Sequence, residues 1–251
     1  QLLYAYSFSN KVSVSSALHY SFGRGYYEEN FNGQDFSKYG ITQALTIGNL
    51  IRRRSLDTDF YGINYAINYA PQTDLKFTLG GYYNHYKGSH FGEILWAQGL
   101  SITNPYRYTN DDAEKTVLNT FAQADYQLGD VNLFVDLQYR RIMYTFIGSN
   151  GSLGNFQPGD QLNFFSPKVG ISYQLSKEDK IYASYSIANG EARREQYLNF
   201  LAGAKPQSQR LNNIGIGYST QREKLTLGVD AFGMFYQNQL ISSGGMNAVA
   251  E

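Results

Sequence analysis

The sequence predicts an all-β protein, a transmembrane antiparallel β-barrel, and two observations support this prediction. Segments of about ten residues alternate apolar and polar side chains, which is the period of two that a strand requires. Short polar turns and long, aromatic-rich connections also alternate along the chain, as they do in a barrel with tight periplasmic turns and long external loops. The turns are residues 9–11, 71–74, 129–130, 176–179 and 221–224, and the long connections are residues 28–48, 88–113, 148–161 and 189–206.

Ten segments are expected to form strands, each bounded by turn or loop residues. In chain order they are residues 2–9, 11–27, 51–70, 75–88, 114–128, 131–147, 162–175, 180–188, 207–220 and 225–241. The first two segments flank the turn 9–11. The third places Tyr61, Ile63, Tyr65, Ile67 and Tyr69 on one face and Gly62, Asn64, Ala66 and Asn68 on the other. The fourth follows the proline-containing turn 71–74.

The remaining segments form hairpins in which the same two faces recur. The fifth and sixth flank Gly129 and Asp130, the seventh and eighth flank residues 176–179, and the last two flank residues 221–224. One face carries Val131, Leu133, Val135, Leu137 and Tyr139, then Ile181, Ala183, Tyr185 and Ile187, then Leu225, Leu227, Val229 and Ala231. This apolar face is expected to contact lipid, and the opposite face to line the barrel.

The polar face contains mostly Asn, Gln, Ser, Thr, Gly and Tyr with few charges, which fits a hydrated lumen better than the exposed face of a sandwich. Asp125, Asp136, Arg140 and Asp230 are expected on this lumen side, facing a plug or the transport path. A slip of one residue in strand 131–140 would turn Arg140 toward lipid, at a cost of roughly 2–4 kcal/mol near the bilayer centre. The register is therefore expected to be fixed.

Composition excludes several classes of function. The 251 residues offer no linker at which to divide the chain, so it is expected to be part of a single barrel domain. Twenty-one basic and 21 acidic residues balance, which argues against nucleic-acid binding. There is no cysteine, no apolar run of about 18 residues that would form a transmembrane helix, and no signal peptide at the start.

The strand order places both ends of the chain on the side of the long connections. An open sheet of ten strands would also leave two rows of unpaired backbone groups in hydrocarbon. We therefore expect further strands on both sides, and the rival is a closed barrel of ten strands.

Several motifs resemble those of one family when taken in order. They are residues 92–97 (GEILWA), 136–140 (DLQYR), 164–173 (FFSPKVGISY), 180–186 (KIYASYS), 205–207 (KPQ), 214–218 (IGIGY) and 235–240 (FYQNQL). This succession resembles TonB-dependent outer-membrane receptors, with the first two segments similar to receptors of the Bacteroidetes type. The chain departs from the family pattern at residues 190–192, where Gly-Glu-Ala replaces Arg-Glu-Pro, and at Gln207, which replaces Glu.

The resemblance implies a 22-strand barrel around an N-terminal plug, with this chain as the middle-to-late part of the barrel and the plug absent from it. It implies a bacterial outer-membrane receptor that imports a scarce ligand, such as a siderophore, another metal chelate or a cofactor, by TonB-coupled uptake. The implied partners are outer-membrane lipid, the TonB complex through the plug, and a small-molecule ligand. A passive porin or surface adhesin without a plug is the alternative, and a soluble carbohydrate-binding β protein is a third possibility.

The sequence indicates no enzyme, no cofactor and no metal site. No nucleophile-elbow motif or recognisable triad is present, and the glycines of residues 148–159 lack the Lys-Ser/Thr of a phosphate loop. His85 and His90 are five residues apart in an expected strand, which places them on opposite faces.

Ligand contacts are instead expected from the long external connections, whose length favours a functional role. Their candidate residues are Trp96, Tyr106, Arg107, Tyr108, Arg193, Arg194 and Tyr197. Aromatic and Arg side chains offer rigid contact area and directional hydrogen bonds. Membrane-interface anchoring and packing between loops are the alternative roles for these residues.

Overall fold

The computed structural model confirms the all-β prediction and describes residues 1–43, 45–102, 104–150, 154–156, 159–193 and 206–239. These residues form one antiparallel sheet in which strands follow one another in chain order, with β7 paired to β6 beside the main path. The strands are β1 (Leu2–Ser7), β2 (Val12–Asp35), β3 (Ile47–Tyr69), β4 (Leu75–Ala97), β5 (Tyr106–Leu128), β6 (Val131–Asn150), β7 (Gly154–Phe156), β8 (Gly159–Gln174), β9 (Asp179–Gly190), β10 (Gln209–Arg222) and β11 (Leu225–Gln237). A short 3-10 helix, η1 (Phe36–Tyr39), follows β2.

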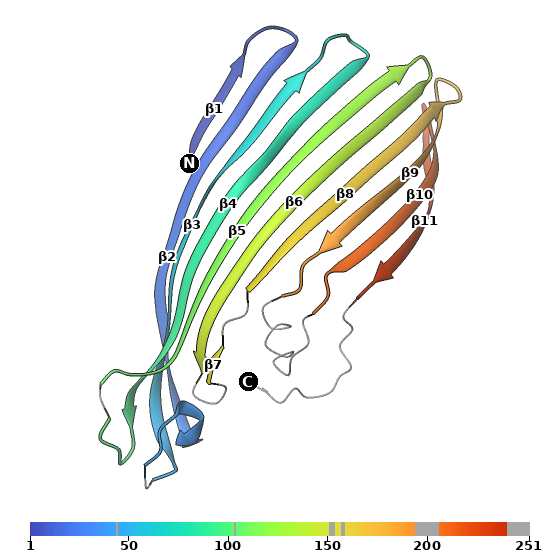
Figure 1. The fold of residues 1–251 in the computed structure, drawn as a ribbon. Coiled ribbons are helices and arrows are strands. Elements are labelled where there is room, and N and C mark those ends of the chain that lie inside the picture. The colour runs from blue at the N-terminus through green and yellow to red at the C-terminus, as the bar shows by residue number, and fades with distance from the viewer. Residues whose placement is uncertain (44, 103, 151–153, 157–158, 194–205, 240–251) are drawn as a thin grey trace.

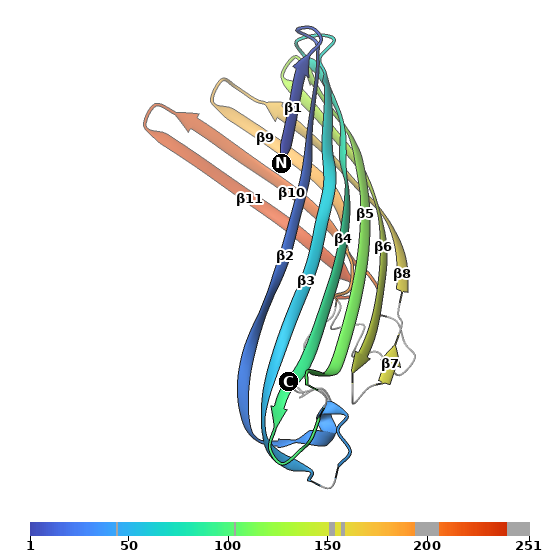
Figure 2. The ribbon, with the colours of Figure 1, turned by 90° about the vertical axis from the view of Figure 1, so that its left-hand side faces the viewer.

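The sheet is a curved trough, as Figures 1 and 2 show. The five predicted short turns gather at one end, here called the turn end, and the longer connections lie at the opposite loop end. In Figure 2 the strands β9 to β11 swing back toward the side on which β1 lies. Strands β1 and β11 form the two edges of this sheet. No helix among the described residues is long and apolar enough to cross a membrane.

The outer face of the trough is apolar, as the alternation predicts. Val14, Ile67, Leu79, Ala122 and Leu137 are register partners across five neighbouring strands and form one continuous row. Further rows of the same face contain Leu133, Val169, Ile171, Ile216 and Val229. Leu79 and Leu137 are 48% and 43% exposed because no other element covers this face. An uncovered apolar face of this extent is the surface that a barrel turns to hydrocarbon.

Strands β2 to β5 are longer than the sequence predicts. Each has 23 or 24 residues, so the predicted long connection 88–113 is wrong over most of its length and the predicted connection 28–48 is wrong over about half of it. The actual connections between these strands are residues 36–46 and 98–105. The predicted connection 148–161 likewise includes the end of β6 and all of β7. About ten tilted residues suffice to cross a bilayer, so the additional residues extend beyond it.

Charged pairs hold the sheet together in this extension, where the apolar alternation stops. The Arg53 guanidinium lies 2.6 Å from the Glu28 carboxylate on the neighbouring strand. The Arg52 guanidinium lies 2.6 Å from Glu29 and packs 4.5 Å from the ring centre of Phe31. Cross-strand pairs of opposite charge stabilise a sheet as apolar pairs do, but they leave no apolar period in the sequence.

The extension has a small core of its own. Phe36, Leu50 and Ile94 are fully buried there, together with Tyr39, Ile41 and Ala97. We call this part, the loop ends of β2 to β5 with η1, the outcrop. The carboxylate of Asp35 caps η1 by accepting hydrogen bonds from the Ser37 hydroxyl and backbone N–H, at 2.7 and 2.9 Å, and these bonds hold the pKa of Asp35 below its usual value.

At the turn end, Asp179 begins β9 just outside the apolar rows. Its carboxylate accepts hydrogen bonds from the Tyr218 hydroxyl at 2.6 Å and the Ser176 hydroxyl at 2.7 Å. These bonds favour the charged form and lower the pKa of Asp179 to about 2. The turn between β8 and β9 is thus tied to β10 by one carboxylate.

Because β6 has a lipid-facing and an inner face, substitutions at two neighbouring residues are expected to change the free energy of unfolding by different amounts. Leu137→Arg would place a charge on the lipid side, with a loss of roughly 2–4 kcal/mol in the free energy of unfolding from a bilayer. Gln138→Arg, one residue later on the inner face, is expected to change that free energy much less. Urea unfolding of the full-length protein from liposomes measures both values. Equal losses in the two variants would contradict the assignment of faces.

Asp179 predicts an acid dependence of stability. Hydrogen bonding lowers the pKa of Asp179 in the folded protein. The contribution of Asp179 to the free energy of unfolding is therefore fully present above the unfolded pKa of about 3.9, and it is lost as pH falls through the folded pKa of about 2. Asp179→Asn should therefore flatten the stability profile between about pH 4 and pH 2. Denaturant unfolding of both proteins across this range is the measurement. Parallel profiles would show that the hydrogen bonds to Asp179 do not stabilise the fold.

Candidate functional site

A hollow on the inner face, near the loop end, brings together residues from four parts of the chain. Its volume is about 380 Å³, and we call it the mouth pocket. Tyr86 and His90 come from β4, Asp111, Ala113 and Lys115 from β5, Tyr144 from β6, and Glu191, Ala192 and Arg193 from the segment after β9. The strand residues share the inner face because they are offset by one position from the apolar outer rows.

An ion pair closes one side of this pocket. The Lys115 ammonium lies 2.6 Å from the Glu191 carboxylate, and both side chains are about one-third exposed, at 32% and 30%. Strand β5 and the end of β9 are separated in the sheet by β6 and β8, so the pair crosses the trough. Residues 191–193, which follow β9, must therefore lie over the inner face.

A second contact anchors the end of β9 to the same face. The Arg140 guanidinium donates a 2.8 Å hydrogen bond to the Asn189 backbone carbonyl and lies 5.1 Å from the ring centre of Phe164. The Asn189 amide donates to the Phe165 carbonyl and the Ser166 hydroxyl, both at 3.0 Å. These contacts fix the direction in which the chain leaves β9.

The pocket chemistry suits a polar ligand of mixed charge. Two phenols, an imidazole, an ammonium, a guanidinium and two carboxylates line it, and the Tyr86 hydroxyl lies 3.5 Å from His90 Nε2. Such groups donate and accept directional hydrogen bonds around a bound molecule. Among the described residues, no group of three His, Asp or Glu side chains is arranged to hold a metal ion directly.

Four predicted ligand-contact residues lie in or beside the outcrop. Tyr106 donates a 3.3 Å hydrogen bond to the Gly40 carbonyl, and the Tyr108 ring packs edge-on against Tyr39 at 5.0 Å. Arg107 pairs with Glu93 at 3.2 Å and stacks 4.1 Å from the Phe91 ring centre. Trp96 is 48% exposed. Packing between loops occupies three of these side chains, and ligand contact for all four stays a prediction.

Of the three candidates after β9, the structure places Arg193 in the mouth pocket. The predictions for Arg194 and Tyr197 lie outside the described residues.

The four predicted lumen residues all fall on the inner face. Asp125 accepts a 3.0 Å hydrogen bond from Asn132, and Asp230 accepts one of 2.6 Å from Tyr182. Arg140 makes the contacts described above. One carboxylate oxygen of Asp136 is buried without a hydrogen-bond partner among the described residues. Whether these groups face a plug or a transport path stays a prediction.

Sequence reasoning missed most of the mouth pocket. Tyr86, Asp111, Lys115 and Tyr144 were not singled out, although the alternation of β4 to β6 assigns each to the inner face. The signal that could have identified these residues is the register of the three long strands β4, β5 and β6, considered together. The predicted loop 88–113 hid His90 and Asp111, because residues in a loop have no assigned face, whereas Tyr86, Lys115 and Tyr144 lie in predicted strands whose neighbours the sequence alone did not align.

Comparison with known proteins gives one family-model match. The family model described as "TonB dependent receptor-like, beta-barrel" matches residues 1–250. No curated protein sequence matches the chain.

Solved structures match the fold at low identity. The unliganded ferric citrate transporter FecA is 14% identical, with 98% of this chain and 35% of that one covered and a TM-score of 0.68. The copper transporter OprC is 15% identical, with coverages of 91% and 37% and a TM-score of 0.66. The siderophore receptor PiuA from Acinetobacter baumannii is 12% identical, with coverages of 92% and 38% and a TM-score of 0.60. The chain thus spans a little over one-third of the length of the structures it matches.

The ion pair across the trough predicts a measurable coupling between Lys115 and Glu191. A double-mutant cycle with Lys115→Gln and Glu191→Gln should give a coupling of roughly 0.2–1 kcal/mol in the free energy of unfolding, because both groups are partly solvated. Pairing Lys38→Gln, in η1, with Glu191→Gln provides the control and should give none. A coupling of zero in the first cycle would mean that the segment after β9 is not held by this pair.

Proposed function

Because the chain belongs to the TonB-dependent receptor-like β-barrel family, we propose that it forms part of an outer-membrane receptor that imports a scarce ligand by TonB-coupled uptake. The mouth pocket carries this proposal. It opens at the loop end, where a ligand arriving from outside first meets the trough, and its polar groups come from strands as well as from a connection. Sites built on strands hold their geometry better than sites built on loops alone.

The ligand proposed is a small metal chelate. The solved proteins of similar fold are named for ferric citrate, copper and a siderophore. The mouth pocket offers hydrogen-bonding groups of both charges but no metal-binding cluster among the described residues. Such a site recognises the organic ligands around an ion, through Lys115, Arg193 and the phenols, and needs no bond to the ion itself.

The chain is proposed to form the middle-to-late wall of a larger barrel of 22 strands. Two observations support this. The sheet has open edges at β1 and β11, and the matched structures are almost three times as long as the matched segment. An unpaired strand edge within hydrocarbon costs several kcal/mol per backbone group, so neighbouring strands are required.

In this proposal a plug domain that is not part of this chain transmits the force exerted by TonB. The barrel wall contacts outer-membrane lipid, the mouth pocket contacts the ligand, and the inner-face groups Asp136 and Arg140 face the plug. The role requires binding and gated release, and no catalysis by this chain. A Bacteroidetes-type origin rests on the sequence resemblance and stays a prediction.

A deletion strain tests the transport role. Growth on limiting iron supplied as ferric citrate, a ferric catecholate or haem, or on limiting cobalamin, should fail for at least one source and be restored by the intact gene. The restored growth should be lost again when TonB is also deleted. Growth that persists without TonB would indicate a passive porin, and no growth defect on any source would contradict import.

Pocket variants then test the site. Tyr144→Phe and Lys115→Gln each remove one hydrogen bond to the ligand, and together should weaken binding of the source so identified about tenfold or more. Lys38→Gln, in the outcrop, is the matched control and should bind normally. Radiolabelled ligand binding to whole cells measures the change. Unchanged binding in the double variant would exclude the mouth pocket as the ligand site.

A further inference from the structure

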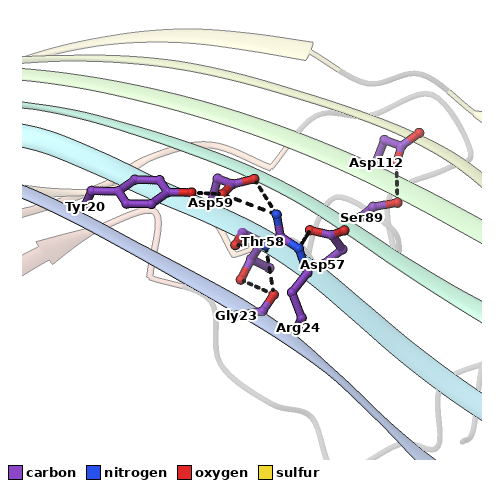
Figure 3. Close-up of polar contacts among 8 residues, drawn as sticks. All are labelled: Tyr20, Gly23, Arg24, Asp57, Thr58, Asp59, Ser89 and Asp112. Atoms are coloured by element: carbon purple, nitrogen blue, oxygen red, sulfur yellow. Dashed lines mark hydrogen bonds and ion pairs between the residues drawn. The ribbon is translucent and has the colours of Figure 1, made fainter.

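The charged groups at the two ends of the outer face are satisfied to different degrees. At the loop end they contact one another, as Figure 3 shows. The Arg24 guanidinium lies 2.8 Å from Asp57 and 3.2 Å from Asp59. The Asp112 carboxylate accepts a 2.6 Å hydrogen bond from the Ser89 hydroxyl. These groups already have partners, whereas an arginine at the turn end of the same face has only a distant one.

This arginine is Arg222, the last residue of β10. Ile216, Tyr218 and Arg222 are separated by even numbers of residues along the strand, so they share the outer face. The Arg222 side chain is 62% exposed, and its guanidinium lies 3.8 Å from the Asp179 carboxylate. Both oxygens of that carboxylate accept shorter hydrogen bonds, from Tyr218 at 2.6 Å and Ser176 at 2.7 Å. Arg222 makes no hydrogen bond within the described part of the chain, so its N–H donors can serve another acceptor.

An apolar groove of about 560 Å³ lies on the same face of β8 to β11. It is formed by two rows of register partners, which are Tyr173, Ile181, Tyr218 and Val229 nearer the turn end, and Ile171, Ala183, Ile216 and Ala231 beyond them. The second row alternates large and small side chains. The methyl group of Ala183 therefore leaves a notch between its register partners Ile171 and Ile216.

The groove and Arg222 lie at successive depths of the bilayer. Tyr173 and Tyr218 stand at the end of the groove nearest the turns, and aromatic residues of this kind mark the membrane interface of a barrel. Arg222 is four residues farther along β10, roughly 13 Å along the strand and about 10 Å along the membrane normal for a tilt of about 40°. The groove is thus at the depth of acyl chains, and the guanidinium is at the depth of lipid headgroups.

We propose that the groove and Arg222 together bind one phospholipid of the leaflet on the turn side, with an acyl chain in the groove and the phosphate on the guanidinium. Charge complementarity supports this occupant, because guanidinium and phosphate groups form paired charge-assisted hydrogen bonds. The groove is also continuous with the lipid-facing rows, since Ile171 is the register partner of Leu133. An acyl chain therefore enters it directly from the bilayer, whereas a purely apolar occupant leaves Arg222 without an anion.

Native mass spectrometry of the full-length protein, purified in detergent, tests this proposal. The protein is mixed with equal amounts of phosphatidylglycerol and of a diacylglycerol that has the same acyl chains but no phosphate, and the retained molecules are counted. Phosphatidylglycerol should be retained about threefold or more over diacylglycerol, as one partly solvated charge contact allows. Equal retention of the two would exclude a phosphate contact with Arg222.

Variants with matched controls assign the retention to this site. Arg222→Gln should abolish the preference for phosphatidylglycerol, and Arg222→Lys should keep it. Lys180→Gln, which removes a cation near the same turns but on the inner face, should keep it as well. Ala183→Leu fills the notch and should lower the retention of both lipids about threefold, whereas Ala122→Leu, in the lipid-facing row of β5, should not.

Three outcomes would overturn the proposal. Retention that is unchanged in Ala183→Leu, or a preference that is lost in Lys180→Gln, would locate the lipid elsewhere. A wild-type dimer that Ala183→Leu dissociates would show that a second copy of the chain fills the groove instead. Because Ala183 and Arg222 are both exposed, their variants should fold, and a thermal melt of each one beside the wild type checks this.

Discussion

The pairing of backbone groups is the constraint on which the rest of this structure depends. In hydrocarbon no water satisfies an N–H or C=O group, so each must find a partner in a neighbouring strand. The sheet meets this requirement by joining each strand to the next along the chain, with β7 alone beside the main path. Once the ladder is fixed, so is the face of every side chain, because successive residues point to opposite sides. The apolar rows through Leu79 and Leu137 and the polar interior are two consequences of one register.

Beyond the bilayer the same ladder continues for a different reason. Water could satisfy the backbone there, and loops would suffice. The strands β2 to β5 remain paired because Arg52 and Arg53 bridge to carboxylates on β2, and because Phe36, Leu50 and Ile94 form a core between the two hairpins. Charge pairs that are partly exposed contribute little each. The buried core therefore supplies most of the stability of the outcrop, and the charge pairs supply its register.

The sequence predicts those features that depend on neighbours in the chain. Turns such as Gly129 and Asp130, and the faces of Asp136 and Leu137, follow from local residue types and a period of two. The full length of β2 and β4 could not be predicted, since Glu28, Glu29 and Glu93 interrupt the apolar alternation and find their partners on another strand. The mouth pocket depends on contacts of the same long-range kind. Lys115 and Glu191 are 76 positions apart and meet only because the chain turns back over the trough after β9.

The long register also determines which side chains reach the mouth pocket. Tyr86 lines the mouth pocket and Lys87 lies on the outer face, and Lys115 and Glu114 divide in the same way one strand along. A slip of one residue between β4 and β5 would exchange these positions, turning Lys115 to the outer face and Glu114 to the inner face. Near the bilayer centre the cost of exposing polar groups to lipid prevents this slip, whereas at the loop end water surrounds both faces and imposes no such cost. The geometry of the mouth pocket is thus determined by the apolar rows farther along the same strands, and the strands transmit it because their ladder is unbroken except at single bulges.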